Sequence, residues 1–309
     1  MARRYIPSRG DVVWLSFSPQ VGHELEDTRL WSSRRLRITA RLALRCCARL
    51  PGCLRMKSSG ERIMSRSASR IGAACAIAGS VLLFVGTYLH PMEADPNEAV
   101  AAFAEYAADH LWVASHLTQL VGVALMVAAL LFLTQQLEVK SGLGWAQIAT
   151  GGAIASLAVA TVLQAVDGIA LKRMVDIWAA APALQKEGAF HAAFAVRQIE
   201  IGLASMLSLS MGLTVILYGV ALLVDNTYPK VVGGLAILGG VPTMVAGVVM
   251  AYTGFSELAM AINMPASSLL LVWMLILGGC MWRQGGMEKA KHASPLPRAH
   301  AHSDTHGSG

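Results

Sequence analysis

Six long apolar runs between Ile71 and Trp282 constrain the fold more than any other feature of the chain. Each is about 20 residues or longer, which lets a helix cross about 30 Å of hydrocarbon. Unpaired backbone groups are too costly in lipid, and no alternating barrel pattern occurs, so the runs are predicted to be helices. The predicted spans are residues 71–90, 111–133, 145–171, 199–224, 231–252 and 260–282.

The predicted fold is therefore an all-α, polytopic membrane protein, a bundle of six transmembrane helices over residues 64–285. Only 14% of the residues are charged, against about 25% in soluble domains. The loop 91–110 has no Lys or Arg, whereas basic residues precede the first span and follow the last one. Both termini are therefore expected in the cytoplasm, and the protein in the cytoplasmic (inner) membrane, with the lipid bilayer as its partner.

Two connections between spans carry further signals. Asp95-Pro96-Asn97-Glu98 has the order of an N-cap followed by a helical first turn, which predicts an outer amphipathic helix before the second span. Residues 174–198 are too polar to span and contain Pro182 and Gly188, so two short interfacial helices are expected there.

The two ends of the chain differ from the bundle. Residues 1–70 carry 15 of the 25 Lys and Arg residues but only 5 of the 19 Asp and Glu residues, so the net positive charge comes from the head and not from the bundle. It gives no reason to expect a nucleic-acid partner. Residues 286–309 are polar and predicted to be a disordered tail containing histidines. The 5 cysteines form neither a disulfide framework nor a zinc spacing, and no cofactor or dedicated metal is expected.

Gly233, Gly240, Gly247 and Gly254 recur at seven-residue intervals along the fifth span. Glycines on one stripe allow a second helix to approach closely, and a period of seven suits left-handed packing. The stripe is a helix-packing surface that could also join two copies of the chain. The alternative is that glycine is simply common in membrane helices.

Polar side chains inside apolar spans are costly and are the candidate functional residues. The predicted topology puts all of them in the outer third of the bundle, and three pairs at i, i+3 each share a helix face. We expect them to form one polar pocket. The set is His90, His116, Gln119, Gln164, Asp167, Arg197 and Glu200.

Three interpretations of this pocket stay open. It could be a site for an unidentified small molecule or ion, with His116 and Asp167 exchanging protons and Arg197 holding an anion. It could be a hydrogen-bonded network that only orders the helices. A metal-dependent hydrolase is the third possibility, but no complete catalytic motif occurs in the spans, so an enzyme is not predicted.

The first 29 residues carry a second pattern. It consists of Arg4-Tyr5-Ile6-Pro7, Gly10-Asp11-Val12-Val13-Trp14-Leu15, Phe17, Pro19, Gly22, His23 and Glu24. This stretch resembles the first strand and loop of MazF/PemK-type toxins, which are mRNA endoribonucleases. The likeness covers under a tenth of the chain and implies no activity here, because the rest of the small β-barrel and its catalytic positions are missing.

The resemblance stops in an informative way. Arg29 to Arg35, read one base earlier with suitable codons, allow Pro-Ala-Leu-Val-Leu-Ser-Pro, and Arg45 to Arg49 in the same frame allow Ala-Leu-Leu-Cys-Pro. Both resemble later strands of the toxin family. Residues 1–63 are therefore interpreted as a truncated or frameshifted toxin-like head, disordered or partly β-like, with a native start at Met64. A genuine basic extension is the alternative.

Residues 64–285 resemble small multi-pass bacterial membrane proteins whose domains have no assigned function. The resemblance rests on residues 95–98, 112–116 and 171–176, and it implies no activity. The leading interpretation is an integral membrane protein with a non-catalytic binding, stress-related or structural role. A transporter or permease using the polar pocket is the alternative, and a defective toxin-type endoribonuclease fused to a membrane anchor is a third.

Overall fold

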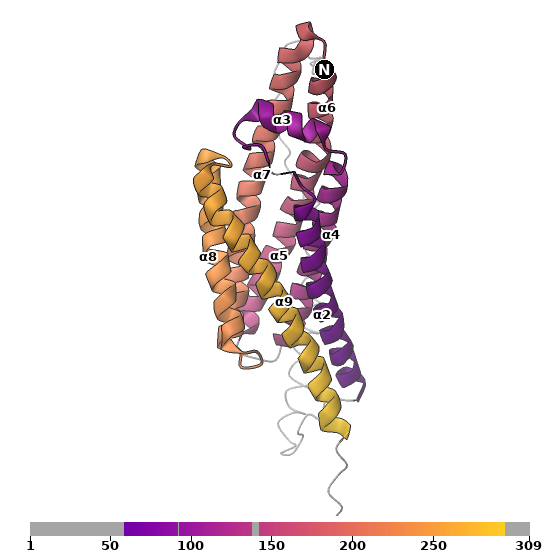
Figure 1. The fold of residues 1–309 in the computed structure, drawn as a ribbon. Coiled ribbons are helices and arrows are strands. Elements are labelled where there is room, and N and C mark those ends of the chain that lie inside the picture. The colour runs from indigo at the N-terminus through magenta and orange to yellow at the C-terminus, as the bar shows by residue number, and fades with distance from the viewer. Residues whose placement is uncertain (1–58, 92, 138–141, 294–309) are drawn as a thin grey trace, which may run out of the picture. The chain divides into compact units, whose positions relative to one another are not determined.

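The computed structural model describes residues 59–91, 93–137 and 142–293, with side chains described between Ser67 and Gly285. This part of the chain is helical and contains no strand (Figure 1). The helices are α2 (Ser59–Tyr88), α3 (Ala99–Ala108), α4 (Trp112–Leu137), α5 (Leu143–Gln164), the π-helix η1 (Ala165–Leu171), α6 (Lys172–Ala180), α7 (Ala183–Val224), α8 (Lys230–Thr253) and α9 (Glu257–Ala293).

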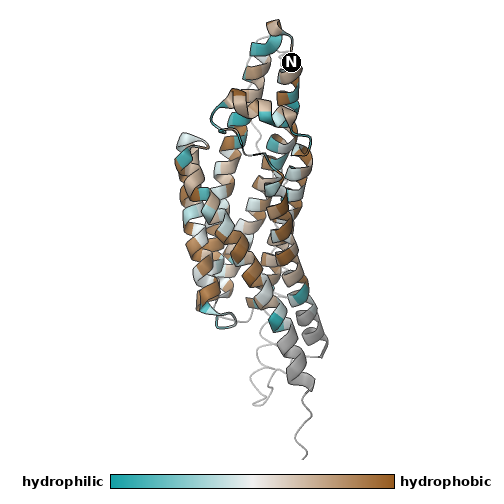
Figure 2. Ribbon diagram, in the orientation of Figure 1, coloured by the Kyte–Doolittle hydropathy of each residue, from teal (hydrophilic) through white to brown (hydrophobic). Residues whose placement is uncertain are grey.

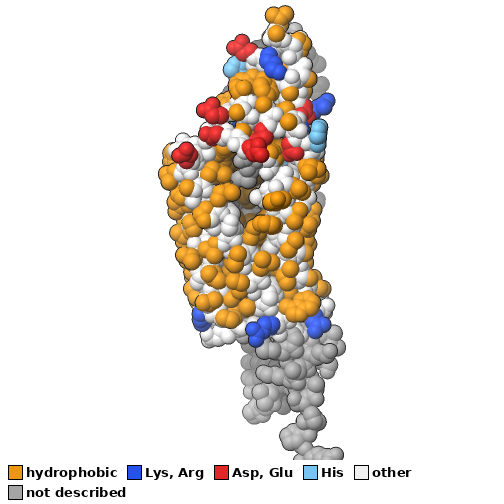
Figure 3. Space-filling model, viewed as in Figure 1, with side chains coloured by type: hydrophobic (Ala, Val, Ile, Leu, Met, Phe, Trp, Pro, Cys, Tyr) orange, Lys and Arg blue, Asp and Glu red, His pale blue; other side chains and the backbone are white. Residues whose placement is uncertain are grey.

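Six helical stretches are long and apolar enough to cross a membrane, which confirms the predicted multi-pass, all-α fold. They are Ser67–Tyr88, Trp112–Leu137, Leu143–Ala180, Ala183–Val224, Lys230–Thr253 and Glu257–Gly285. Hydrophobic residues concentrate along the middle of these helices and hydrophilic ones toward their ends (Figure 2). In space-filling view a broad apolar surface separates acidic side chains at one end from Lys and Arg at the other (Figure 3). The protein therefore contacts the lipid bilayer.

The six spans form a ring in which neighbours in sequence are neighbours in space. α2 packs on α4, α4 on α5, α5 on α7, α7 on α8 and α8 on α9, and α9 closes the ring against α2 (Figure 1). α3 lies across the end that carries the acidic side chains (Figures 1 and 3). The ring brings the start of α9 close to the segment that follows α2.

Prolines set several of the boundaries. α2 ends at Tyr88, two residues earlier than predicted, because Pro91 disfavours helical backbone at His90. His90 therefore lies in an irregular segment and not at the end of a span. α3 begins after Glu98, so the predicted cap at Asp95 is wrong. The Asp95 carboxylate instead accepts the backbone N–H of Asn97 at 2.9 Å and closes a local turn.

The segment predicted to form two interfacial helices is helical, but it extends the third and fourth spans. α6 follows η1 directly, and α7 starts at Ala183, well before the predicted residue 199. Together they project as a hairpin beyond α3 (Figure 1). The Lys172 ammonium group donates to the Tyr106 and Ala107 carbonyls at 3.0 and 3.1 Å, at the C-terminus of α3. This position is favourable for a cation and accounts for one basic residue at the acidic end.

The two predicted terminal segments, residues 1–63 and 286–309, lie largely outside the described residues. Of the toxin-like head, residues 59–63 are described, and they belong to α2. α9 continues to Ala293, so the prediction of disorder is wrong for residues 286–293.

The predicted glycine stripe packs against a neighbouring helix of the same chain. A Cβ at Gly233 would lie 2.7 Å from the Gly219 carbonyl oxygen, and one at Gly240 would lie 2.9 Å from that of Gly212. Gly247 is also buried against α7, whereas Gly254 ends α8 with a positive φ of 64°. The predicted use of the stripe for self-association is not supported, because α7 already covers its three inner glycines.

A second stripe at the same spacing was missed from sequence. Gly72, Gly79 and Gly86 face α4, and a Cβ at Gly79 would lie 2.7 Å from the Gly122 carbonyl oxygen. The two close helix pairs, α2 with α4 and α7 with α8, stand on opposite sides of the ring.

The described core forms two clusters. The larger one fills the bundle toward the basic end with Ala, Leu and Met side chains around Trp273 and Tyr218. The smaller one is aromatic and joins α3 to α4, α6 and α7 through Phe103, Trp112 and Trp178. The buried polar residues His116, Arg197 and Glu200 belong to neither cluster.

Candidate functional site

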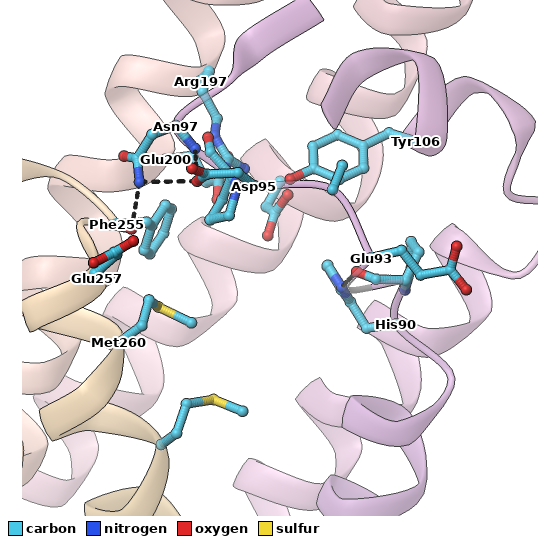
Figure 4. A pocket seen from close by; sticks show the side chains of 15 residues that line it. His90, Glu93, Asp95, Asn97, Tyr106, Arg197, Glu200, Phe255, Glu257 and Met260 are labelled. Atoms are coloured by element: carbon cyan, nitrogen blue, oxygen red, sulfur yellow. Dashed lines mark hydrogen bonds and ion pairs between the residues drawn. The ribbon is translucent and has the colours of Figure 1, made fainter. Parts of the chain in front are cut away.

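A cavity of about 620 Å³ opens between α3, α7 and the start of α9 (Figure 4). Its wall combines the irregular segment after α2 with side chains from η1, α7 and α9. The lining residues are His90, Pro91, Glu93, Ala94, Asp95, Pro96, Asn97, Tyr106, Asp167, Arg197, Glu200, Phe255, Glu257, Met260 and Met264.

Hydrogen bonds fix the irregular segment that forms one wall. The backbone N–H groups of Glu93 and Ala94 donate to the Glu105 carboxylate at 2.9 and 3.1 Å. The Asn97 side-chain amide donates to the Phe255 carbonyl oxygen at 2.8 Å, which ties the segment to the turn between α8 and α9 (Figure 4).

The cavity is strongly acidic. Five lining residues are Asp or Glu, and one is Arg. Glu93, Asp95 and Glu257 are exposed at the mouth, whereas Asp167 and Glu200 lie inside. Met260, Met264 and Phe255 supply apolar surface beside them. Such a wall favours a positively charged ligand over an anion.

Arg197, one interpretation of which was an anion-holding role, forms an ion pair within the wall of the cavity. Its guanidinium group donates twice to the Glu200 carboxylate, at 2.8 and 3.0 Å, and both side chains are buried. The guanidinium carbon also lies 5.5 Å from the ring centre of Tyr106 and 4.9 Å from that of Phe255. The charge of Arg197 is thus paired and covered within the wall.

His116 of α4 and Asp167 of η1 meet across two spans. The His116 Nε2 atom lies 3.0 Å from an Asp167 carboxylate oxygen, and Nδ1 lies 2.7 Å from the Trp112 carbonyl oxygen. The Trp112 indole N–H donates to the Asp167 backbone carbonyl at 3.0 Å. A π-helical turn at this position leaves carbonyl groups free for such bonds, and these turns recur at functional sites.

Gly168 makes this approach possible. A Cβ at this residue would lie 2.5 Å from the His116 Cβ, so a larger residue would push η1 away from α4. The glycine next to Asp167 is therefore part of the geometry that brings the two side chains together.

His90 completes a cluster with the same residues. Its ring lies 4.6 Å from the Trp112 ring and 5.1 Å from the His116 ring, and its Nδ1 lies 2.7 Å from the Pro91 carbonyl oxygen. Burial, followed by the nearby His116, lowers the pKa of His90 below its ordinary value. One ligand atom from each of His90, His116 and Asp167 lies within 4.8 Å of the others, so these three side chains could hold a metal ion.

The two glutamines pair outside the lining of the cavity. The Gln164 amide donates to the Gln119 side-chain oxygen at 3.2 Å, between α5 and α4. They are one helical turn from Asp167 and His116, as their i, i+3 spacing requires. The predicted single pocket is therefore divided: His90, Asp167, Arg197 and Glu200 line the cavity, His116 stands behind Asp167, and the glutamines form a separate contact.

Several lining residues were missed from sequence. Tyr106, whose pKa burial raises to about 12, comes from α3, Asn97 and Phe255 come from the irregular segments at that end, and Glu257 begins α9. The sequence feature that could have indicated these residues is the acidic loop without Lys or Arg. This loop could not indicate Phe255, because Phe255 is 158 residues from Asn97, whose side chain donates to its carbonyl oxygen.

Comparison with known proteins adds no relative: no family model, no curated protein and no solved structure matches this chain.

Proposed function

We propose that the protein is a membrane-embedded binding protein that receives a small, positively charged solute in the acidic cavity. The observation that carries this proposal is the charge of the wall. Five carboxylate side chains line the cavity, and its one Arg is neutralised by Glu200. A solute with a cationic group and an apolar body would meet the exposed carboxylates first and then Met260 and Met264.

A binding role is favoured over transport by what lies beside the cavity. Toward the basic end the ring is filled by the larger core cluster, which includes Trp273, Leu277 and Tyr218 at 0–1% exposure. A permease would have to open this packed region to pass a solute. The proposal therefore assigns the cavity a binding or sensing role without translocation or catalysis.

The orientation is also part of the proposal. Arg70 in the first half of α2, Lys230 at the start of α8 and Arg283 in the second half of α9 belong to the helix ends that lie away from α3 (Figure 1), and the positive-inside rule assigns that end to the cytoplasm. The cavity then opens away from the cytoplasm, in the inner membrane of a bacterial cell.

The binding proposal is tested with a matched pair of probes. Choline carries the positive charge, and 3,3-dimethylbutanol is its neutral isostere. In detergent at low salt, choline should raise the melting temperature and the neutral isostere should not. Raising the salt concentration should weaken the effect of choline through screening.

Two variants locate the effect. Glu257→Gln removes one carboxylate at the mouth and should weaken choline binding roughly two- to fivefold. Glu187→Gln on the projecting hairpin removes an exposed carboxylate outside the cavity and should leave binding unchanged. Equal stabilisation by the neutral isostere would count against an electrostatic site.

For the head, we propose that residues up to about Met64 are the out-of-frame remnant of a MazF/PemK-type toxin gene. α2 begins at Ser59, but its membrane-spanning part, Ser67–Tyr88, lies wholly after Met64. A protein started at Met64 should therefore insert fully into membranes. The nucleotide sequence is the direct test: a toxin frame that reads intact after one base is restored supports the proposal, and a shifted frame full of stop codons removes it.

A further inference from the structure

We propose that His90, His116 and Asp167 form a binding site for a divalent transition-metal ion of the zinc class in the wall of the acidic cavity. This inference goes beyond the solute-binding role and does not depend on it. It rests on how hydrogen bonds orient the two imidazoles, on an unsatisfied carboxylate oxygen and on the spacing of the three ligand atoms.

The two histidines present the same nitrogen. Nδ1 of each ring lies 2.7 Å from a backbone carbonyl oxygen, that of Trp112 for His116 and that of Pro91 for His90. A carbonyl oxygen only accepts, so Nδ1 must carry the hydrogen. In a neutral imidazole the other nitrogen, Nε2, then holds a free lone pair. Zinc-binding histidines are oriented in this way, with the second nitrogen donating to a carbonyl or carboxylate.

With the two histidines in this tautomer, neither carboxylate oxygen of Asp167 has a hydrogen-bond donor among the described residues. Its Oδ2 faces the His116 Nε2 lone pair at 3.0 Å, so the two acceptors require a positive charge between them. Its Oδ1 is buried without a hydrogen-bond partner among the described residues. A buried acceptor left unpaired is destabilising and needs an explanation. A cation bound to the carboxylate satisfies both oxygens.

The spacing of the ligand atoms suits a single ion. Donor atoms around a tetrahedral zinc ion lie about 3.3 Å apart, given bonds of about 2.0–2.1 Å. His116 and Asp167 are already 3.0 Å apart, and all three ligand atoms lie within 4.8 Å of one another. Because His90 and Asp167 line the cavity, a fourth position would face it.

Trp112 holds the three ligands together. Its carbonyl oxygen accepts from His116, its indole N–H donates to the Asp167 backbone at 3.0 Å, and its ring packs beside both imidazoles, 4.6 Å from that of His90 and 4.7 Å from that of His116. One residue thus contacts the α4, η1 and post-α2 components of the site. Outer partners of this kind tune metal affinity by roughly 10- to 100-fold.

The test is a zinc titration of the full-length protein in detergent, purified through a tag without histidine. His292, His300, His302 and His306 are replaced by alanine so that the tail contributes no binding. After chelator treatment, Zn²⁺ is titrated in competition with a chromophoric chelator. We expect one saturable site per chain, and His116→Gln, His90→Gln and Asp167→Asn should each weaken it by at least about 100-fold.

Two controls keep the test decisive. His191→Gln changes an exposed histidine on the hairpin and should leave the zinc affinity unchanged. If a ligand variant does not yield folded protein, Trp112→Phe keeps the backbone carbonyl but loses the indole N–H, and should weaken zinc binding about 10- to 100-fold.

The outcomes separate this inference from the solute-binding proposal. A wild-type protein without saturable zinc binding overturns the metal site, and the His116–Asp167 contact is then a proton-bridged pair, whatever the result with choline. Equal loss of zinc affinity in His191→Gln overturns it as well. Glu257→Gln should weaken choline binding while zinc affinity stays within about twofold, since an exposed charge contributes little.

Discussion

The helices pack differently at the two ends of the bundle. Toward the basic end, glycines and alanines bring backbones into contact, and the interior is dry and filled. At the acidic end, charged side chains are buried beside a cavity and pair with one another: Arg197 with Glu200 within α7, and His116 of α4 with Asp167 of η1. One end is built for close packing, and the other leaves a cavity whose wall must be neutralised locally.

The difference between the two ends indicates where a functional site can lie in this bundle. Apolar packing through small residues needs no ligand to account for it, because close contact between helices is stabilising in lipid. Buried charged residues are different, because removing a charge from water is costly and an apolar replacement of an ion pair is often as stable. The acidic end therefore contains the residues that close packing does not explain, and for that reason both proposed sites are placed there.

The largest expected effect comes from separating the buried ion pair. Glu200→Ala leaves the guanidinium of Arg197 buried at 7% exposure without its partner. We expect a loss of about 3–5 kcal/mol in the free energy of unfolding. The double variant Arg197→Met/Glu200→Leu removes both charges and should recover most of that loss. Denaturant unfolding in detergent measures both, and a double variant as unstable as the single one would show that the pair does more than neutralise itself.

The next effect breaks the close-packed end. Gly233→Val places a branched side chain against the Gly219 backbone of α7, and overpacking of this kind should destabilise the fold by about 3 kcal/mol. Gly234→Val is the matched control, because a Cβ there meets nothing within 4 Å. Thermal unfolding of the two variants decides the point. Similar melting temperatures would mean that α7 and α8 do not depend on backbone contact.

Features that depend on one segment of the chain could be predicted from the sequence, and contacts between distant helices could not. Hydropathy and length act within one segment, so the predicted span 231–252 nearly matches α8, Lys230–Thr253. The glycine spacing of α8 likewise identified a packing face. The partner of that face could not be read from the sequence, because it requires the order of the ring.

The site was predictable only in part for the same reason. The i, i+3 rule identified Arg197 and Glu200 on one helix face, and they pair directly. The rule could not show that Asp167 lies in a π-helical turn, nor that its backbone carbonyl accepts a hydrogen bond from Trp112 of another helix. Nor could it place His90 outside the helix beside His116.

A smaller effect is expected at Gly168 in η1, where close packing occurs at the acidic end. Gly168→Ala adds one methyl group against the His116 Cβ and should cost about 2 kcal/mol, because neither backbone can move freely. Zinc affinity should fall with it, since Asp167 would be displaced. Gly151→Ala in α5 is the control, because a Cβ there meets nothing within 4 Å. A stable Gly168→Ala variant that keeps its zinc affinity would contradict the described approach of η1 to α4.

The smallest effect concerns a cluster of hydroxyl groups inside the close-packed end. The Tyr218 hydroxyl of α7 lies 3.0 Å from the Thr134 hydroxyl and 3.1 Å from that of Thr150, and it donates to the Leu130 carbonyl at 3.2 Å. Tyr218→Phe keeps the ring and loses these bonds, so we expect a loss of about 1 kcal/mol. Both threonine hydroxyls still donate to carbonyls of their own helices. Because nothing charged is left unpaired, thermal unfolding should show a much smaller change than Glu200→Ala. A loss as large as that of Glu200→Ala would mean that the filled end depends on polar contacts after all, and the contrast between the two ends would fail.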